Sequence, residues 1–119
     1  MGSKKSCFGR RLRQARECFG IPQDRLGVLI GLDEGCSSAR ISRYETGIHA
    51  PPFEVAQKIA RVLGVPEPFF YCEDDGLASI ILRVNKLSDT ERTHLDEYLN
   101  RFDCQSDLAL QILLKSKDP

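Results

Sequence analysis

The sequence has no Trp and a single Met, and none of its apolar runs approaches the roughly 20 residues of a membrane-spanning helix. Lys4 and Lys5 precede no apolar segment, so no secretory signal is expected. At 119 residues, one domain is expected, with room for an extension. We therefore expect a cytoplasmic protein that makes no membrane contact.

Closely spaced metal ligands are also lacking. The cysteines include no Cys-x-x-Cys pair, which argues against a zinc knuckle, and we expect free thiols in a reducing cytosol. Residues 72–75 (Cys-Glu-Asp-Asp) cannot readily converge on one ion because they are consecutive, so we expect a solvated link and the acidic start of a helix. No cofactor is predicted. The cysteines are Cys7, Cys18, Cys36, Cys72 and Cys104.

Catalytic motifs are missing as well. The sequence has no P-loop, no dinucleotide-binding fingerprint and no His-Glu-x-x-His motif. Its two histidines, His49 and His94, are far apart and lack an evident Ser or Cys partner. We therefore expect a binding protein rather than an enzyme.

Net charge is zero, but the charges are unevenly distributed. Residues 1–47 contain nine Lys and Arg against five Asp and Glu, whereas residues 48–119 contain eight against twelve. A basic half of this kind indicates nucleic-acid contact when a recognition motif accompanies it. Alone, the arginines of the first helix would be interpreted as a solvated helix face.

The most informative segment is 23–45, QDRLGVLIGLDEGCSSARISRYE. Apolar residues recur there at intervals of three and four, at Leu26, Leu29 and Ile30, which predicts a helix that starts at Gln23. Gly31 is expected to end this helix in the left-handed conformation. A second helix is predicted from about 38 to 46, with an inner face of Ile41 and Tyr44. Two short helices around a tight corner suit the major groove of DNA.

Ser37 or Ser38 is the expected cap of this second helix, because a serine hydroxyl can accept a hydrogen bond from its first amides. Gly27 lies inside the first helix, where glycine costs about 1 kcal/mol relative to alanine. Close approach of the second helix would explain why a glycine stands at this position. Cys36, near the start of the second helix, is either a reactive redox sensor or merely a small tolerated residue.

The chain resembles the XRE-type, Cro/phage-repressor-like family of bacterial helix-turn-helix regulators. The likeness runs from about Phe8 to Phe70, through FGRRLRQARECFGIPQ, RLGVLIGL, ARISRYETG and PPFEVAQKIARVLGV. It implies an all-α fold, with a five-helix Cro/repressor-like helix-turn-helix domain at 5–72 and a helical extension at 76–115. It also implies a sequence-specific regulator, most simply a homodimeric repressor that binds a two-fold symmetric operator in double-stranded DNA.

The resemblance supplies part of the candidate DNA interface. In this family a Gln at the position of Gln23 contacts a phosphate, and the loop after the recognition helix lies against the DNA backbone, which makes His49 a phosphate neighbour. The arginines of the first helix would raise non-specific affinity. The candidate DNA-binding residues are Gln23, Ser37, Ser38, Ala39, Arg40, Ser42, Arg43, His49 and Arg10.

One spacing departs from the family pattern. Six residues usually separate the turn glycine from the aliphatic residue of the recognition helix, whereas Gly31 and Ile41 are ten apart. We expect the four additional residues to lengthen the turn. Asp33 and Glu34 would then point away from the phosphates or accept a hydrogen bond from a cytosine amine.

Further helices are expected at 5–19, 52–63 and 66–71. Gly20 and Gly64 are predicted to end the first two. The residues expected to face the core are Phe8, Leu12, Ala15, Phe19, Val55, Ile59, Val62, Leu63, Phe69, Phe70 and Tyr71.

The extension at 76–115 begins with an apolar pattern at Ala78, Ile81, Leu82 and Leu87. The sequence Ser-Asp-Thr-Glu at 88–91 then predicts a capping box. The following helix would align Leu95, Tyr98, Leu99 and Phe102, and residues 108–114 are apolar on nearly every side. A terminal helix of this kind would pack back on its own domain or contact a second copy of the chain, and of the two we expect the dimer.

Two other functions keep the same fold. An antitoxin-type autorepressor would bind a small protein partner through the C-terminal helices. A protein-interaction adaptor would use those helices and would not bind DNA. A small basic partner that co-purifies favours the first, and absent or salt-insensitive DNA binding favours the second.

Overall fold

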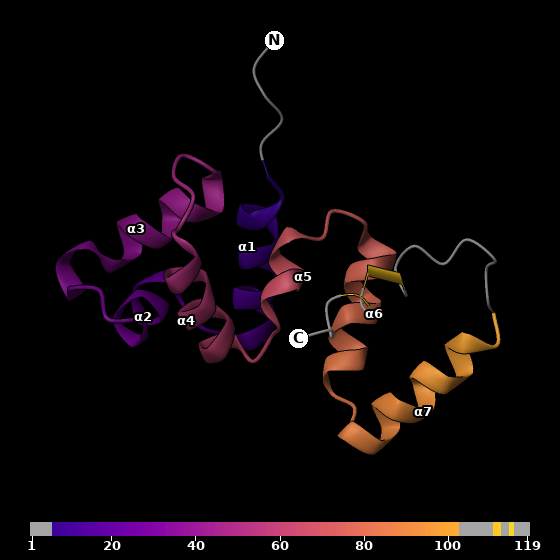
Figure 1. Cartoon of the computed structure of the whole chain (residues 1–119). Helices are drawn as coiled ribbons and strands as arrows, with labels where there is room; N and C mark the ends of the chain where they lie inside the picture. The colour runs from indigo at the N-terminus through magenta and orange to yellow at the C-terminus, as the bar shows by residue number, and fades with distance from the viewer. Residues whose placement is uncertain (1–5, 103–110, 113–114, 116–119) are drawn as a thin grey trace, which may run out of the picture. The chain divides into compact units, whose positions relative to one another are not determined.

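The computed structural model describes residues 6–102, 111, 112 and 115, and its folded elements are helices, as predicted (Figure 1). In these residues a first compact unit extends to Lys86, and a second begins at Leu87. The elements are α1 (Phe8–Phe19), α2 (Gln23–Leu29), α3 (Glu34–Thr46), α4 (Phe53–Leu63), α5 (Glu67–Tyr71), α6 (Asp75–Asn85) and α7 (Asp89–Asn100). None of these helices is both long and apolar enough to cross a membrane.

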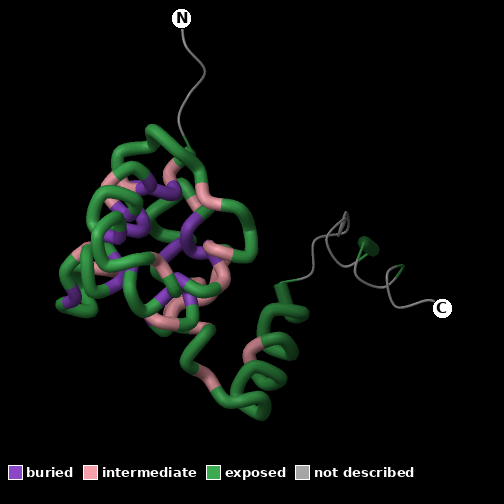
Figure 2. Tube along the Cα trace, turned by 90° about the vertical axis from the view of Figure 1, so that its left-hand side faces the viewer, coloured by how far each residue is buried: buried purple, intermediate pink, exposed green. Residues whose placement is uncertain are grey.

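The core of the first unit forms where α1 packs against α3, α4 and α5, and the buried residues gather in its interior (Figure 2). Leu12, Ile41 and Ile59 are fully buried there. Phe8 stacks against Phe70, with ring centroids 4.9 Å apart. The apolar periodicity of α1 therefore identified the side of the helix that packs.

The predicted core was wrong at two aromatic residues. Phe19 is 56% exposed and Tyr71 is 50% exposed, although both were expected to face inward. Phe19 lies in the last turn of α1, just before Gly20 ends the helix in the left-handed conformation. Periodicity gives the side of a helix that packs, but not how far along the helix its neighbours extend.

The bounds of the fourth and fifth helices agree closely with the prediction. Gly64 ends α4 with φ of 70°, as expected. Ile59 and Leu63 of α4 are buried, whereas Val55 and Val62 pack only partly against the core. The positions between them are buried alanines, Ala56 and Ala60, which let α4 approach its neighbours closely.

Helix α6 packs on the first unit, although the sequence placed it in the extension that was to begin at 76. Ala78 is buried, and Ile81 and Leu82 pack against the same core. Asp74 caps α6 by accepting a hydrogen bond from the Leu77 amide at 2.7 Å. The acidic residues of 72–75 therefore start a helix, as expected.

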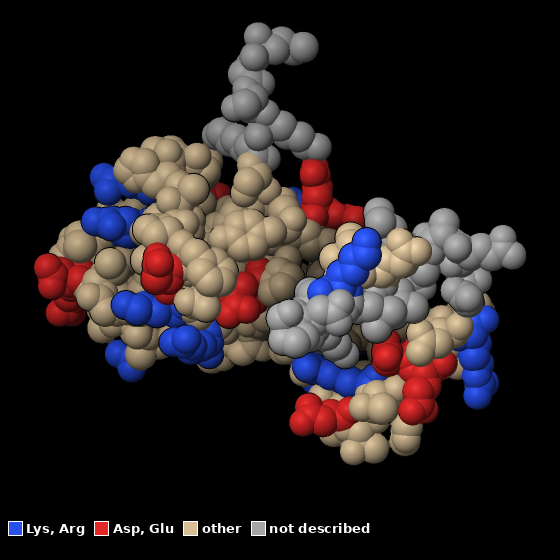
Figure 3. Space-filling view, in the orientation of Figure 1, with Lys and Arg blue, Asp and Glu red and all other residues tan. Residues whose placement is uncertain are grey.

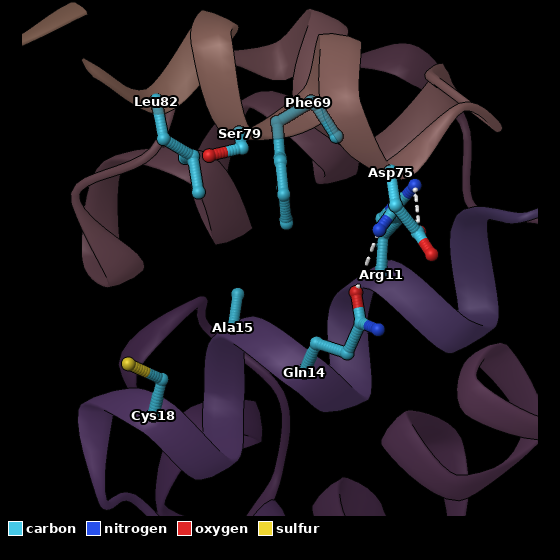
Figure 4. Close-up of a pocket in the computed structure, with 9 residues that line it drawn as sticks. Arg11, Gln14, Ala15, Cys18, Phe69, Asp75, Ser79 and Leu82 are labelled. Atoms are coloured by element: carbon cyan, nitrogen blue, oxygen red, sulfur yellow. Dashed lines mark hydrogen bonds and ion pairs between the residues drawn. The ribbon is translucent and has the colours of Figure 1, made fainter.

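A buried arginine holds the start of α6 against α1 (Figure 4). Arg11 donates to the backbone carbonyls of Cys72 and Glu73 at 2.8 and 2.9 Å, and its guanidinium lies 2.9 Å from the Asp75 carboxylate. Beside it, α1, α5 and α6 line an open, largely apolar pocket of about 410 Å³, to which Ala15 and Leu82 contribute.

The second unit contains α7. Its predicted capping box is confirmed: the Ser88 hydroxyl accepts from the Glu91 amide, and the Glu91 carboxylate accepts from the Ser88 amide. Tyr98 and Leu99 are 52% and 55% exposed. Most of the apolar segment predicted at 108–114 lies outside the described residues.

Candidate nucleic-acid interface

The corner between α2 and α3 is short, and the four additional residues lie in the helix. Helix α3 has 13 residues and begins at Glu34, directly after Asp33. The expectation of a lengthened turn and of a helix start at Ser38 was therefore wrong. At 1.5 Å per residue, the additional turn extends α3 by about 6 Å at its leading end.

Ser37 does not cap α3 but lies inside it, fully buried. Its hydroxyl donates to the Asp24 carbonyl of α2 at 2.9 Å, so it bonds across the corner rather than to the first amides of its own helix. A Cβ added at Gly27 would overlap the Ser37 side chain, which confirms that Gly27 allows the two helices to approach closely. This burial removes Ser37 from the candidate DNA contacts.

The other end of α3 is held by Glu45, whose side chain is 1% exposed. The Glu45 carboxylate accepts from Arg16 Nε at 2.5 Å and from Gln23 Nε2 at 3.0 Å. Arg16 also donates to the Ile21 carbonyl at 3.0 Å. The hydrogen bond to Glu45 raises the pKa of the Arg16 guanidinium above its ordinary value. Helices α1, α2 and α3 are thus tied to one carboxylate.

Ser37 and Glu45 are the two anchors of α3, and between them the helix presents a polar outer face. Ser38, Ala39, Arg40 and Arg43 are exposed, and Ser42 is half-buried. Within the described part of the chain, Arg40 and Arg43 form no side-chain hydrogen bond or ion pair. Basic side chains lie along α3 and over α2 and α4, on the left-hand side of the molecule (Figure 3).

The leading end of α3 carries the opposite charge. Asp33 and Glu34 are both exposed, and the Asp33 side chain makes no capping hydrogen bond. In Figure 3 acidic side chains lie at the left-hand edge, where α3 begins. Because these residues open a helix rather than a loop, their position relative to Arg40 and Arg43 is fixed by the helix itself.

The arginines of α1 have partners inside the first unit. Arg11 and Arg16 bind the residues described above, and Arg10 lies 3.2 Å from Asp75. Arg13 lies 3.6 Å from Glu17 and 3.5 Å from Glu45. The expectation that the first-helix arginines raise non-specific DNA affinity was therefore wrong for Arg11 and Arg16, whose guanidinium groups are bound within the protein. Arg10, a candidate DNA contact, faces the start of α6 instead.

Gln23 is half-buried and bound within the protein, whereas His49 is exposed. The Gln23 side chain is half-buried and donates to Glu45, with the Ser38 hydroxyl 3.5 Å from its oxygen, and its phosphate contact stays a prediction. His49 is exposed after Gly47, and its amide donates to the Arg43 carbonyl at 3.2 Å. It therefore lies beside the end of α3, as its predicted role requires.

Sequence reasoning missed one feature of this interface, the buried Glu45 carboxylate that joins three helices. Glu45 was noted only as part of a family motif, and no local pattern pairs it with Arg16, which lies 29 residues earlier in another helix. Cys36 is exposed in the first turn of α3, with its thiol 3.5 Å from the Asp33 carbonyl. Its redox role stays a prediction.

Comparison with known proteins agrees with this geometry. Residues 8–68 match a protein family described as helix-turn-helix domain. Among solved structures, the chain is similar to the crystal structure of transcriptional regulator BswR, with 38% sequence identity and a TM-score of 0.74. That likeness covers 78% of this chain and 92% of the other. No curated protein matches the chain.

Proposed function

The chain belongs to the helix-turn-helix domain family, and we propose that it is a cytoplasmic, XRE-type transcriptional repressor that binds a two-fold symmetric operator as a homodimer. The outer face of α3 would contact base edges and adjacent phosphates. The residues assigned to this contact are Ser38, Ala39, Arg40, Ser42 and Arg43, with Gln23 and His49 beside the DNA backbone. The protein would act by binding, without catalysis.

The observation that carries this proposal is the contrast between two sets of arginines. Arg11 and Arg16 of α1 are bound to carbonyls and carboxylates within the first unit. Arg40 and Arg43 are exposed on α3 and have no such partner among the described residues. A guanidinium that is not engaged can donate two hydrogen bonds to guanine O6 and N7 or bind a phosphate.

The homodimer is supported by α7 and by the size of one recognition helix. Tyr98 and Leu99 of α7, and Phe102 just after its end, are more than half exposed in the second unit. One helix in the major groove covers too few bases to specify a genomic site, and a symmetric pair doubles the sequence that is bound. A dimer bound to its operator would exclude other proteins from the same DNA. This exclusion is the reason for proposing a repressor.

The first experiment is selection of bound duplexes from a random-sequence library by the purified full chain, followed by a salt titration. Enrichment of a two-fold symmetric sequence, with affinity that falls steeply as salt rises, is expected because phosphate contacts release counterions. Failure to enrich any sequence at low salt would contradict a role as a sequence-specific regulator.

Arg40→Ala tests the contact to a base. If Arg40 forms a paired hydrogen bond with guanine, its loss is expected to cost about 1–3 kcal/mol of discrimination at one position of each half-site. The measurement is a repeat selection with the variant, followed by titration of duplexes that differ at that position.

Arg83→Ala is the matched control, because Arg83 is an exposed arginine on α6, on the other side of the first unit from α3 (Figure 1). It is expected to select the wild-type sequence. An Arg40→Ala protein with unchanged preference at every position would remove Arg40 from the base-contacting set.

The exposed apolar residues in and just after α7 also support the antitoxin-type alternative, in which a small protein partner covers Tyr98, Leu99 and Phe102. The two possibilities differ in the mass of the purified protein. A dimer of this chain alone supports the homodimer, whereas a monomer that gains a stoichiometric basic partner in the cell supports the antitoxin.

A further inference from the structure

We propose that the open pocket lined by α1, α5 and α6, called here the α1–α6 pocket, binds a small, uncharged organic molecule. This molecule is mostly apolar and has one hydrogen-bonding group. All the residues that line the pocket belong to the first unit. The inference goes beyond the proposed function, because the pocket shares no residue with the face of α3 assigned to DNA.

The α1–α6 pocket has the size and shape of a small-molecule site. Its volume of about 410 Å³ lies within the range of roughly 300–1,000 Å³ that is usual for such sites. Arg11 and Asp75 close one end (Figure 4). Ala15 of α1 lies opposite Ser79 and Leu82 of α6 across the open space. Closely packed helices leave few gaps larger than a water molecule, so the separation of α1 from α6 creates room for a ligand.

The charges in the lining of the pocket favour an uncharged molecule. Among the described residues that line it, Arg11 is the basic one and Asp75 the acidic one. The Arg11 guanidinium lies 2.9 Å from the Asp75 carboxylate, and it also donates to the carbonyls of Cys72 and Glu73. An ionic ligand would therefore leave water without finding a counter-charge, which is costly. An uncharged ligand avoids this cost.

Two polar groups in the pocket are available to a ligand. The Gln14 carbonyl oxygen accepts from Arg11 Nη1 at 3.0 Å, which leaves the amide nitrogen of Gln14 to donate. The Ser79 hydroxyl has no hydrogen-bond partner among the described contacts. A single hydroxyl, amine or carbonyl on the ligand can bond to one of these groups. Phe69 and Leu82 then contact its apolar part.

The volume of the pocket favours a small molecule over a segment of protein. One turn of α-helix, about 10 Å wide and 5.4 Å long, fills about 420 Å³. A partner helix could therefore place at most one turn in the α1–α6 pocket. A stable protein interface usually buries roughly 800 Å² on each partner, which is more than one turn supplies. A small molecule can use the whole pocket.

The pocket lies on the side of α1 that faces away from α3. Ala15 and Cys18, three residues apart, line the pocket. Arg13 and Arg16, also three apart, lie on the other side of α1 against Glu45 of α3. A molecule in the α1–α6 pocket therefore leaves the outer face of α3 accessible.

The test uses N-phenyl-1-naphthylamine, an uncharged aromatic dye with one N–H group that fluoresces in apolar surroundings, titrated into the full chain. Saturable binding is expected. Ser79→Trp is expected to weaken it by about tenfold or more, because the indole would occupy space that the dye otherwise fills. Arg83→Trp is the matched control, since Arg83 is exposed on the same helix but does not line the pocket. It is expected to keep the wild-type affinity.

Alkylation of the wild-type chain by N-ethylmaleimide locates the bound dye without any substitution. Cys18 lines the pocket and Cys36 lies in α3, and both are exposed free thiols. Saturating dye is expected to slow the alkylation of Cys18 severalfold and to leave the rate at Cys36 unchanged, because a thiol must be accessible to react. Mass spectrometry of the digested protein measures both rates.

Three results would overturn this inference. The first is dye binding that does not saturate or that is equally tight in Ser79→Trp. The second is dye that slows Cys18 and Cys36 equally, or slows neither. The third is a Cys18 that reacts far more slowly than Cys36 without dye, together with no saturable binding, since a protein segment would then cover the pocket.

Discussion

Glu45 is the residue on which the geometry of α3 depends most. Its carboxylate is buried, accepts hydrogen bonds from Arg16 of α1 and Gln23 of α2, and also lies 3.5 Å from Arg13 of α1. A buried carboxylate that keeps its charge must have such partners, because an unpaired charge would be costly to remove from water. The same group therefore fixes the end of the recognition helix and satisfies Arg16.

Glu45→Gln is expected to destabilise the first unit by about 3 kcal/mol, because it leaves the Arg16 guanidinium partly buried without its anionic partner. The measurement is urea unfolding followed by circular dichroism. Glu17→Gln is the matched control, since Glu17 pairs with Arg13 at the surface, and such pairs contribute about 1 kcal/mol or less. Equal stability losses in the two variants would contradict the role assigned to Glu45.

At the scale of elements, α6 is held on α1 by an ion pair that responds to pH. Hydrogen bonds from Arg10 and Arg11 hold the pKa of the exposed Asp75 carboxyl below its ordinary value. A carboxyl with a lower pKa in the folded state stabilises the fold while it is ionised. That contribution is fully present above the unfolded pKa of about 3.9 and is lost as pH falls through the lower folded value.

Asp75→Asn is therefore expected to lower the free energy of unfolding at pH 7 and to approach the wild type as pH falls below about 4. Urea unfolding across this pH range measures the difference. Asp96→Asn is the control, because the Asp96 side chain has no hydrogen bond or ion pair among the described contacts of α7. A difference that stays constant with pH would show that the Asp75 charge is not involved.

The elements that depend on local chemistry were predictable from the sequence. The capping box of α7 is made by Ser88 and Glu91, three residues apart, and the helix stop at Gly64 requires one left-handed glycine. The start of α3 was not predictable in this way. Ser37 is three residues past the first residue of α3, Glu34, and its hydroxyl bonds to Asp24 in another helix.

The candidate interface was likewise predictable where it depends on local pattern and not where it depends on distant partners. Arg40 and Arg43 could be placed on the outer face because they alternate with the buried Ile41 and Tyr44. The burial of Arg11 could not, because its acceptors are carbonyls at Cys72 and Glu73, about sixty positions away. Pattern reasoning identifies a face of a helix, whereas long-range partners decide which charged residues remain available to a ligand.

At the scale of the whole molecule, the proposed dimer makes α7 necessary for operator binding. Leu99→Ser is expected to weaken the dimer, because it removes apolar area at a contact expected to be buried between copies. Analytical ultracentrifugation measures the association. Affinity for the two-fold symmetric duplex is expected to fall, with affinity for a single half-site unchanged.

Glu97→Ser is the control for this prediction, because Glu97 is exposed and lies on the other side of α7 from Leu99. It is expected to leave association unchanged. If Leu99→Ser were as dimeric as the wild type, the contact between copies would have to lie elsewhere in the chain.

The two anchors of α3 also bear on how such a regulator can change its target. Ser37, Ile41, Tyr44 and Glu45 hold the helix from within, and the residues between them face outward. Inherited substitutions on the outer face can therefore alter the preferred sequence while the supporting contacts stay the same. A gene duplicate could acquire a new operator through a few codons, and a protein engineer could exchange those codons for the same purpose.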